Sequence, residues 1–233
     1  MLTREAILKD IEQCAHRAGR PPNSVRLIAV SKAQPPAAIA ALAAQGQRAF
    51  GENYIQEALA KMPLCPQDGI EWHFLGPVQR NKARFVGAHF HWLHSLDSLA
   101  LARALARHLE THHRTLEALI GIDVLEDGRK HGLTLRDLPV FLEGFLADPA
   151  LAPVLHLRGL MTIGPYPAQE AASARCFAAL RKAAEACVSR FALRGFDQLS
   201  MGMSDDYRIA IAEGATMVRI GRALFGERPP KNA

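Results

Sequence analysis

The feature that most constrains the fold of this chain is a regular alternation of short apolar segments with amphipathic helical segments. Eight segments have the length and apolar character of buried strands, and each is followed by a helix or a helical turn. The expected strands span residues 25–32, 49–52, 72–75, 91–95, 119–124, 158–163, 198–203 and 217–221. Because strands that alternate with helices form parallel sheets, this pattern predicts a closed (β/α)8 barrel, a TIM barrel.

An extra N-terminal helix is expected over residues 3–18, ahead of the first strand. Further helices are expected at residues 36–45, 54–62, 79–86, 135–146, 169–190 and 206–213, with another beginning at Asp97 or Ser98. No linker rich in proline, glycine or serine divides the chain, so residues 1–233 are predicted to form a single domain with a disordered tail at 228–233. An open doubly wound sheet is the alternative, but it needs a glycine-rich turn after an early strand, which residues 31–34 do not supply.

Composition limits the classes of partner. The net charge is +5, but the basic residues are spread along the chain, which favours a small anionic ligand over nucleic acid. The four cysteines show neither a CxxC motif nor zinc spacing and are expected to be free thiols in a reducing cytosol, so a cytoplasmic protein is predicted. No signal peptide and no apolar run of membrane-spanning length is present, so no membrane partner is expected.

Lys32 is the first candidate functional residue. It ends the first apolar strand, on the face that Ile28 and Val30 share, and two prolines follow at Pro35 and Pro36. On an apolar face, desolvation would lower the pKa of the lysine and leave a neutral amine able to attack an aldehyde. The alternative is a lysine that extends from the strand end into water.

The ends of the seventh and eighth strands occupy the usual phosphate position of such a barrel. Gly221 would let the backbone approach an anion closely, Ser204 adds a hydroxyl, and Arg222 lies at the same strand end. Each also has an ordinary interpretation, since Ser204 could cap the following helix and Gly221 could be a turn residue. A phosphate site opposite a reactive lysine fits pyridoxal 5′-phosphate, an aldehyde that carries a phosphate.

Arg219 lies two residues before Gly221 on the same strand face. If that face points inward, the guanidinium can reach the cofactor ring, and because it cannot give up a proton, the ring nitrogen would stay neutral. The alternative is a surface ion pair. Asn53, just past the second strand, adds a neutral polar group to the expected pocket, and Tyr166 is a candidate for its mouth.

Metal and carboxylate chemistry are not favoured at this end of the barrel. The strand ends contain no paired carboxylates and no cluster of metal ligands, and no catalytic residue or metal site is predicted. His89, His91, His112 and His113 lack a carboxylate or cysteine at ligand spacing, so they are interpreted as solvated or core histidines.

Together these residues resemble a known family. The chain is similar to the pyridoxal phosphate homeostasis protein family, the YggS-like or proline-synthase-co-transcribed group, over about residues 4–227. The stretches that carry the resemblance are AVSK at 29–32, FGENYIQE at 50–57, WHFLGPVQRNK at 72–82, RGLMTI at 158–163, LSMGMSDD at 199–206 and MVRIG at 217–221. Gln34 departs from the family, which often has a basic residue there.

The resemblance implies a barrel like the N-terminal domain of alanine racemase, the fold type III barrel of pyridoxal phosphate proteins. It implies that Lys32 holds the cofactor as a Schiff base, that the end of strand eight near Ser204 holds the phosphate, and that Arg219 lies near the pyridine nitrogen with Asn53 in the pocket. It further implies a role in vitamin B6 and in amino and keto acid homeostasis, without significant turnover.

Competing functions remain open at this point. A racemase or decarboxylase acting as a dimer is the first alternative, although only seven residues follow Gly226, too few for a second domain that supplies an opposing base. A metal-dependent barrel hydrolase is the second. The expected partners are the cofactor itself and, beyond it, amino acids or cofactor-accepting apo-enzymes, for a chain that is a monomer or a weak dimer.

Overall fold

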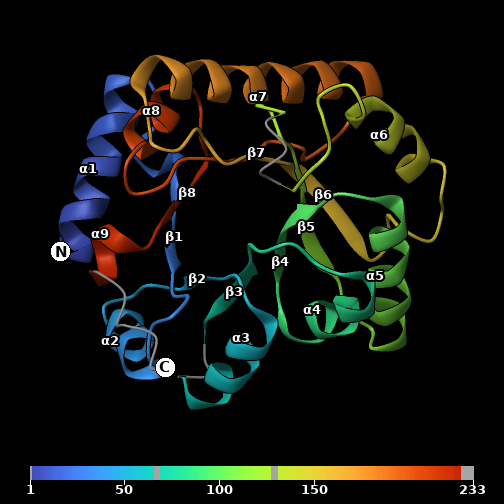
Figure 1. Cartoon of the computed structure of the whole chain (residues 1–233), viewed down its shortest axis with the longest axis horizontal. Coiled ribbons are helices and arrows are strands. Elements are labelled where there is room, and N and C mark those ends of the chain that lie inside the picture. Colours follow the sequence, from blue (N-terminus) through green and yellow to red (C-terminus); the bar gives the residue numbers. More distant parts are fainter. Residues whose placement is uncertain (1, 66–68, 127–130, 227–233) are drawn as a thin grey trace.

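The molecule is a closed barrel with helices around its outside (Figure 1). The computed structural model describes residues 2–65, 69–126 and 131–226. Within these residues eight parallel strands follow one another in chain order around the barrel, and β8 closes it by pairing with β1, where Ile28 lies opposite Arg219. The predicted fold class is therefore confirmed.

The bounds of the elements place the helices between successive strands. The strands are β1 (Arg26–Val30), β2 (Ala49–Glu52), β3 (Glu71–Phe74), β4 (Trp92–Leu96), β5 (Leu116–Gly121), β6 (Leu155–Met161), β7 (Gln198–Ser200) and β8 (Met217–Ile220). The α-helices are α1 (Arg4–Arg17), α2 (Pro36–Ala44), α3 (Ile55–Lys61), α4 (Ala83–His89), α5 (Leu99–Thr111), α6 (Leu138–Leu146), α7 (Glu170–Phe191), α8 (Tyr207–Ala212) and α9 (Arg222–Phe225). Single 3-10 turns lie at η1 (Pro22–Ser24), η2 (Met62–Leu64) and η3 (Arg80–Lys82).

Apolar side chains form two separate layers, as the alternation of side chains along barrel strands requires. A small cluster from six strands fills the inside of the barrel: Ile28, Ala49, Trp92, Leu119, Met161 and Met217. A much larger cluster lies between the strands and the surrounding helices, and it includes Phe50, Phe74 and Phe177. The interior is therefore packed rather than open, and a ligand can enter only at one of its ends.

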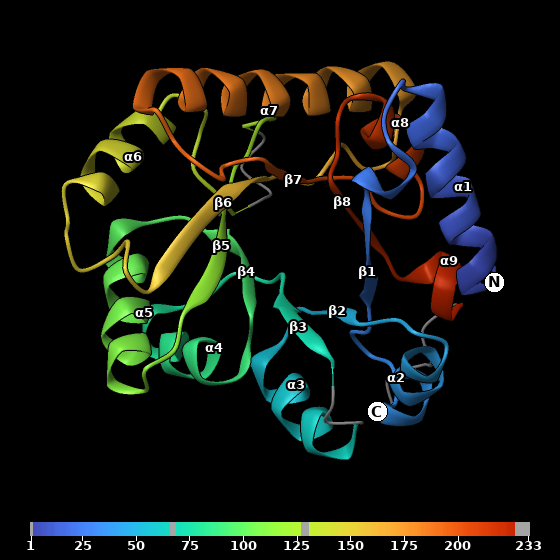
Figure 2. The ribbon, with the colours of Figure 1, turned by 180° about the vertical axis from the view of Figure 1, so that it is seen from behind.

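The extra helix α1 packs beside α8, as both views of the ribbon show (Figures 1 and 2). Its N-terminus is capped by Thr3, whose Oγ accepts a hydrogen bond from the backbone of Ala6 at 3.1 Å. Asp10 of α1 accepts hydrogen bonds from Tyr207 at 2.5 Å and Arg208 at 2.8 Å, which join α1 to α8. The prediction of an additional N-terminal helix is confirmed.

The first strand ends earlier than expected, at Val30 rather than at residue 32. The backbone N–H of Ser31 still donates to Gly51 at 2.9 Å, but the Ser31 carbonyl then accepts from Gln34, which closes a turn. The seventh strand also ends early, at Ser200 rather than at residue 203, and Gly202 has a φ of +90° that extended backbone does not adopt. In both places the residues beyond the strand end are loop residues.

The fifth and sixth strands begin earlier than expected, at Leu116 and Leu155 rather than at residues 119 and 158. Charged residues obscured the apolar pattern there, because Glu117 pairs with His156 at 2.8 Å and with Arg158 at 3.3 Å. The helix expected over 79–86 is η3 followed by α4, and the helix expected from 135 begins at Leu138. The tail expected to be disordered, 228–233, lies outside the described residues.

Candidate functional site

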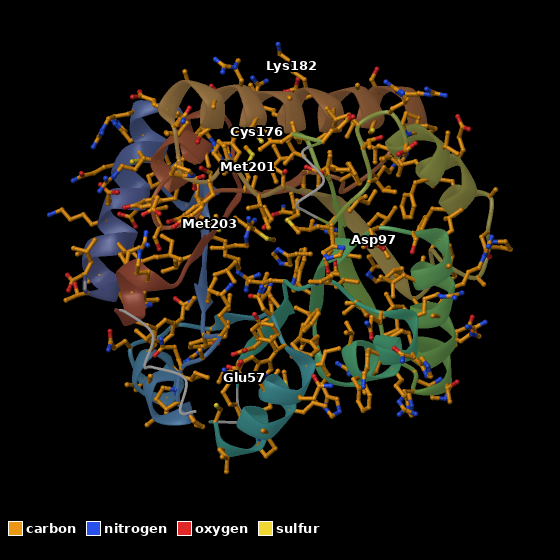
Figure 3. The ribbon with its side chains drawn as sticks, viewed as in Figure 1. Glu57, Asp97, Cys176, Lys182, Met201 and Met203 are labelled. Carbon is orange, nitrogen blue, oxygen red and sulfur yellow. The ribbon has the colours of Figure 1, made fainter. Side chains whose placement is uncertain are left out.

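The six residues predicted to bind a cofactor line one pocket at the carboxyl ends of the strands. The pocket has a volume of about 620 Å³ and is bordered by Lys32, Asn53, Ser204, Arg219, Gly221 and Arg222. Apolar side chains complete its wall, among them Val30, Leu75, Met161 and Met203. In Figure 3 Met203, on the loop after β7, lies toward the inside of the ring of strands, whereas Cys176 lies between that ring and α7. The topology thus joins residues from both ends of the chain in one concave site.

Lys32 lies in the turn that follows β1, two residues past the last strand residue. It is half-buried, so it is less enclosed than a strand residue on the face of Ile28 would be. The next residue, Ala33, has a φ of +60°, the left-handed region that a residue with a Cβ seldom adopts. A backbone in that conformation persists only where surrounding contacts hold it, and here they are found on both sides of Lys32.

A buried cluster of charged residues provides those contacts. Lys61 Nζ lies 2.6 Å from Glu52, 2.7 Å from Glu57 and 2.8 Å from the carbonyl oxygen of Ser31. The Ser31 hydroxyl donates to Glu52 at 2.6 Å, and Glu57 accepts the backbone N–H of Ala33 at 2.6 Å. Burial raises the pKa of Glu52, although Lys61 and Ser31 oppose that shift. The residues on either side of Lys32 are therefore fixed by side chains of β2 and α3.

The sequence analysis did not identify this cluster. Glu57 and Lys61 are four residues apart on the helix that follows the second strand, which places their side chains on one helix face. That spacing, directly after a strand ending in Glu52, is the signal that could have revealed it.

Asn53 enters the pocket wall where two loops approach very closely. A Cβ on Gly76 would lie 2.2 Å from the carbonyl oxygen of Asn53, so only glycine fits at position 76. Ser95 Oγ donates to the Gly76 carbonyl at 2.5 Å and fixes the loop after β3. The side-chain oxygen of Asn53 is buried and has no hydrogen-bond partner within the described residues. A buried acceptor of this kind is costly unless a ligand or water supplies a donor.

Ser204, Gly221 and Arg222 meet at the ends of β7 and β8. Ser204 does not cap α8, whose N-cap residue is Asp206, and its Oγ accepts the backbone N–H of Ala223 in α9 at 3.3 Å. Gly221 has a φ of −116°, so glycine is not required there by backbone strain, but a Cβ would lie 3.2 Å from the carbonyl oxygen of Val30. The exposed guanidinium of Arg222 pairs with the carboxylate of Asp205.

Arg219 points into the barrel, which excludes the surface ion pair considered as its alternative role. It is only 6% exposed and lies at the floor of the pocket. Its guanidinium donates to Ser200 Oγ at 2.7 Å and to the carbonyl oxygen of Thr162 at 2.8 Å. Burial lowers the pKa of Arg219 to about 10, and the nearby carboxylate of Asp206 opposes the shift. Arg219 is therefore a cation at neutral pH.

Tyr166 also lines the pocket, as the sequence suggested. It is 76% exposed and lies on the loop after β6, so its hydroxyl is at the mouth of the site rather than in its floor.

Neither a metal-binding cluster nor a membrane-spanning helix occurs in the described residues. Across residues 2–65, 69–126 and 131–226, no group of three or more histidine, cysteine, aspartate or glutamate side chains is arranged to hold a metal ion. In the same part of the chain, every helix is too short or too polar to cross a bilayer.

Comparison with known proteins defines the class first. The family model for the N-terminal domain of alanine racemase matches residues 2–229. The structure of alanine racemase from Corynebacterium glutamicum superposes with a TM-score of 0.64 at 20% identity, covering 98% of this chain and 62% of that one, which shows a shared fold. The barrel is therefore of the alanine racemase N-terminal type.

Closer relatives define the family within that class. The pyridoxal phosphate homeostasis proteins of Pseudomonas aeruginosa and Escherichia coli K12 are 43% and 42% identical to this chain, over 94% of its length and 91% and 92% of theirs. The structure of PipY from Synechococcus elongatus PCC7942 with pyridoxal phosphate bound has a TM-score of 0.80 at 38% identity, covering 92% of this chain and 98% of that one. The chain belongs to the pyridoxal phosphate homeostasis protein family.

Proposed function

We propose that this protein binds pyridoxal 5′-phosphate in the pocket at the carboxyl ends of the strands and takes part in intracellular vitamin B6 and amino and keto acid homeostasis. The observation that carries the proposal is the convergence of Lys32, Asn53, Arg219 and Ser204 on one pocket of about 620 Å³. The bound cofactor in the related PipY supports it.

The residues of the pocket fit the chemistry of this cofactor. Lys32 is the amine that bonds the aldehyde carbon as a Schiff base, with loss of one water. The buried acceptor of Asn53 has no protein donor within the described residues and can accept one from a ligand, and Arg219 supplies fixed donors at the pocket floor. Ser204, Gly221 and Arg222 form the phosphate end, where Arg222 contributes positive charge beside Asp205. When bound, the cofactor supplies a reactive aldehyde and an aromatic ring that can accept electrons.

We further propose that the protein holds the cofactor without significant turnover of amino acids. A guanidinium beside the ring nitrogen cannot hand over a proton, so it leaves the ring a weak acceptor of electrons. The described pocket residues include no cysteine, histidine, glutamate or second lysine that could serve as an opposing base, and the one carboxylate among them, Asp205, is paired with Arg222. The partners of an open, non-catalytic site of this kind would be cofactor-accepting apo-enzymes and free amino acids, to which the protein would release the cofactor.

A racemase or decarboxylase is the second candidate, and Tyr166 is the observation that favours it. A tyrosine hydroxyl at the pocket mouth is a possible opposing base. Because Tyr166 is 76% exposed, its hydroxyl is hydrated rather than held in a fixed geometry, which favours the carrier over the enzyme.

The test of the proposal is the Lys32→Ala variant. The wild-type protein should turn yellow with pyridoxal 5′-phosphate, and after borohydride reduction the cofactor should be found on the peptide that contains Lys32. Lys32→Ala should fold but remain colourless after reduction and dialysis. Lys182→Ala, which removes an exposed lysine on the outer side of α7 (Figure 3), is the matched control and should behave as wild type. A main adduct on any other lysine would contradict the assignment of Lys32.

A further inference from the structure

A line of polar side chains runs through the inside of the barrel and ends at Arg219. Glu71 and His73 come from β3, His94 from β4, Ser200 from β7 and Arg219 from β8. His73 Nε2 lies 2.7 Å from Glu71 Oε1, and His73 Nδ1 lies 2.9 Å from His94 Nε2. His94 Nδ1 lies 2.9 Å from Ser200 Oγ, which accepts from Arg219 at 2.7 Å. Three hydrogen bonds thus link Arg219, Ser200, His94 and His73, and the close approach of His73 Nε2 to the Glu71 carboxylate extends the line to a fifth side chain.

The three central members are completely enclosed. His73, His94 and Ser200 are each 0% exposed, so water cannot replace a missing partner. The ring of His73 stacks on Trp92 with an interplanar angle of 11° and a centroid separation of 5.5 Å, which fixes its plane. Such a chain in an apolar interior is costly unless every donor meets an acceptor.

The two ends of the chain determine which atoms carry hydrogens. A guanidinium can only donate, so Ser200 Oγ accepts from Arg219 and has its own hydrogen left for His94 Nδ1. His94 then carries its hydrogen on Nε2 and donates it to His73 Nδ1. His73 in turn carries its hydrogen on Nε2, because an unprotonated nitrogen 2.7 Å from a carboxylate would be repelled. All donors point from Arg219 toward Glu71.

The electrostatics of the chain agree with this order. Burial lowers the pKa of His73 to about 4, and burial together with His73 and Arg219 holds the pKa of His94 well below its usual range, so both rings are neutral. Burial alone would raise the pKa of Glu71, but His73 and Arg26 lower that pKa to about 2. The guanidinium of Arg26 lies 2.7 Å from Glu71 Oε1. Glu71 therefore remains an acceptor at every pH at which the protein is expected to work.

We propose that Ser200, His94 and His73 are positioning residues for Arg219, forming a one-way chain of donors anchored on Glu71 that fixes the guanidinium at the floor of the cofactor pocket. The Arg219 guanidinium donates one hydrogen bond to Ser200 and another to Thr162. These two hydrogen bonds fix the direction in which its remaining N–H groups point. The effect on a bound cofactor rests on the proposed function, whereas the order of the hydrogens belongs to the cofactor-free protein. A substitution at Ser200 should therefore change the electrostatic surroundings of the cofactor ring, although Ser200 itself does not line the pocket.

The first experiment uses the protein without cofactor. Nitrogen-15 NMR of the histidine rings at neutral pH should show both His73 and His94 as neutral rings with the hydrogen on Nε2. A charged ring, or a hydrogen on Nδ1 of either residue, would overturn the proposed order. This result does not depend on whether pyridoxal 5′-phosphate is the ligand, so it stands apart from the test with Lys32→Ala.

The second experiment measures the cofactor complex. Ser200→Ala should weaken the binding of pyridoxal 5′-phosphate about tenfold, the effect of one hydrogen bond to a charged group, and should shift the visible absorbance band. Ser200→Thr, which keeps the hydroxyl, should restore both. The control is Ser173→Ala, because Ser173 is equally enclosed but lies on α7 outside the barrel. If Ser200→Ala lowers stability yet leaves the band and the affinity unchanged, the chain only supports the fold and the proposal is wrong.

Discussion

At the scale of single residues, the site depends on what surrounds each side chain rather than on the type of side chain alone. Arg219 and Arg222 are separated by two residues, yet one is buried beneath the pocket and the other is exposed and paired with Asp205. The Arg219 guanidinium is held by buried partners and that of Arg222 by a surface carboxylate, so the two arginines should contribute differently: Arg219 to the ring end of a bound cofactor and Arg222 to the charge of the phosphate end.

Gly221 should distinguish the phosphate end from the ring end. In Gly221→Val the Cβ would lie 3.2 Å from the carbonyl oxygen of Val30, and its methyl groups would occupy the pocket. We expect the affinity for pyridoxal 5′-phosphate to fall at least tenfold, more than about 1.4 kcal/mol, while the weaker affinity for pyridoxal without phosphate changes less.

Titration calorimetry with both ligands on both proteins gives this comparison, and circular dichroism checks that the variant folds. An equal loss for the two ligands would show that the phosphate does not lie near Gly221.

The buried histidines make stability depend on pH in a defined direction. The folded state holds His73 at a pKa of about 4, below its ordinary 6.5, so between these values the unfolded chain binds more protons. Stability is therefore full above pH 6.5 and is lost as the pH falls toward 4. His73 alone should contribute a loss of about 2 kcal/mol between pH 7 and pH 5, and His94 adds to it in the same direction.

Urea unfolding of the cofactor-free protein at the two pH values measures this loss. His112→Asn, at an exposed position, should retain the full pH dependence. A free energy of unfolding that is flat between pH 7 and pH 5 would show that the buried rings do not have to gain a proton on unfolding.

At the scale of elements, the turn after β1 determines where Lys32 lies. Its geometry is maintained by α3, because Glu57 accepts from Ala33 and Lys61 contacts both Glu57 and the Ser31 carbonyl. Helix α3 is thus the element that fixes the turn around Lys32, although α3 itself contributes no residue to the described pocket lining.

Glu57→Ala should release this turn. It removes the acceptor for the Ala33 N–H, so the left-handed conformation of Ala33 loses its support, and stability should fall by about 1–2 kcal/mol. Attachment of the cofactor to Lys32 should slow severalfold because the amine is less well placed. Stopped-flow absorbance and urea unfolding measure the two effects.

The control for Glu57→Ala is Glu185→Ala, which breaks an exposed ion pair with Arg181 at the same spacing on α7. It should change neither quantity by a measurable amount. Unchanged attachment kinetics in Glu57→Ala would show that the turn holds Lys32 without help from α3.

The sequence predicted the strand order, the barrel and six residues that border one pocket, because apolar periodicity and strand-end positions follow directly from local patterns. It did not predict the Lys61 cluster or the line from Glu71 to Arg219, because these contacts join residues up to 106 positions apart that carry no local signal. Strand starts were also misplaced where charged residues such as Glu117 pair across strands at the amino-terminal end of the barrel, away from the pocket. Local sequence patterns therefore indicate which residues face the pocket, whereas the contacts that hold those residues in place are visible only in the three-dimensional structure.

At the scale of the whole molecule, the pocket is open on one side and its lining offers no enclosed proton acceptor opposite Lys32 within the described residues. The protein loaded with cofactor and incubated with L-amino acids in deuterated water should therefore exchange the α-proton more slowly than about 1 s⁻¹, the low end of ordinary turnover. Proton NMR of each amino acid measures the rate. Faster exchange that disappears in Tyr166→Phe would identify an enzyme with Tyr166 as its base.

The packing of α1 against α8 has a consequence for synthesis on the ribosome. Helix α1 is made first, but the residues that cover its apolar face and hold Asp10, including Tyr207 and Arg208, are made almost two hundred residues later. The same is true of β1, whose partner β8 completes the barrel. Closure of such distant contacts is slow, so the nascent chain carries an exposed apolar helix and an unpaired strand edge through most of its translation. This early segment is where a chaperone would be needed most.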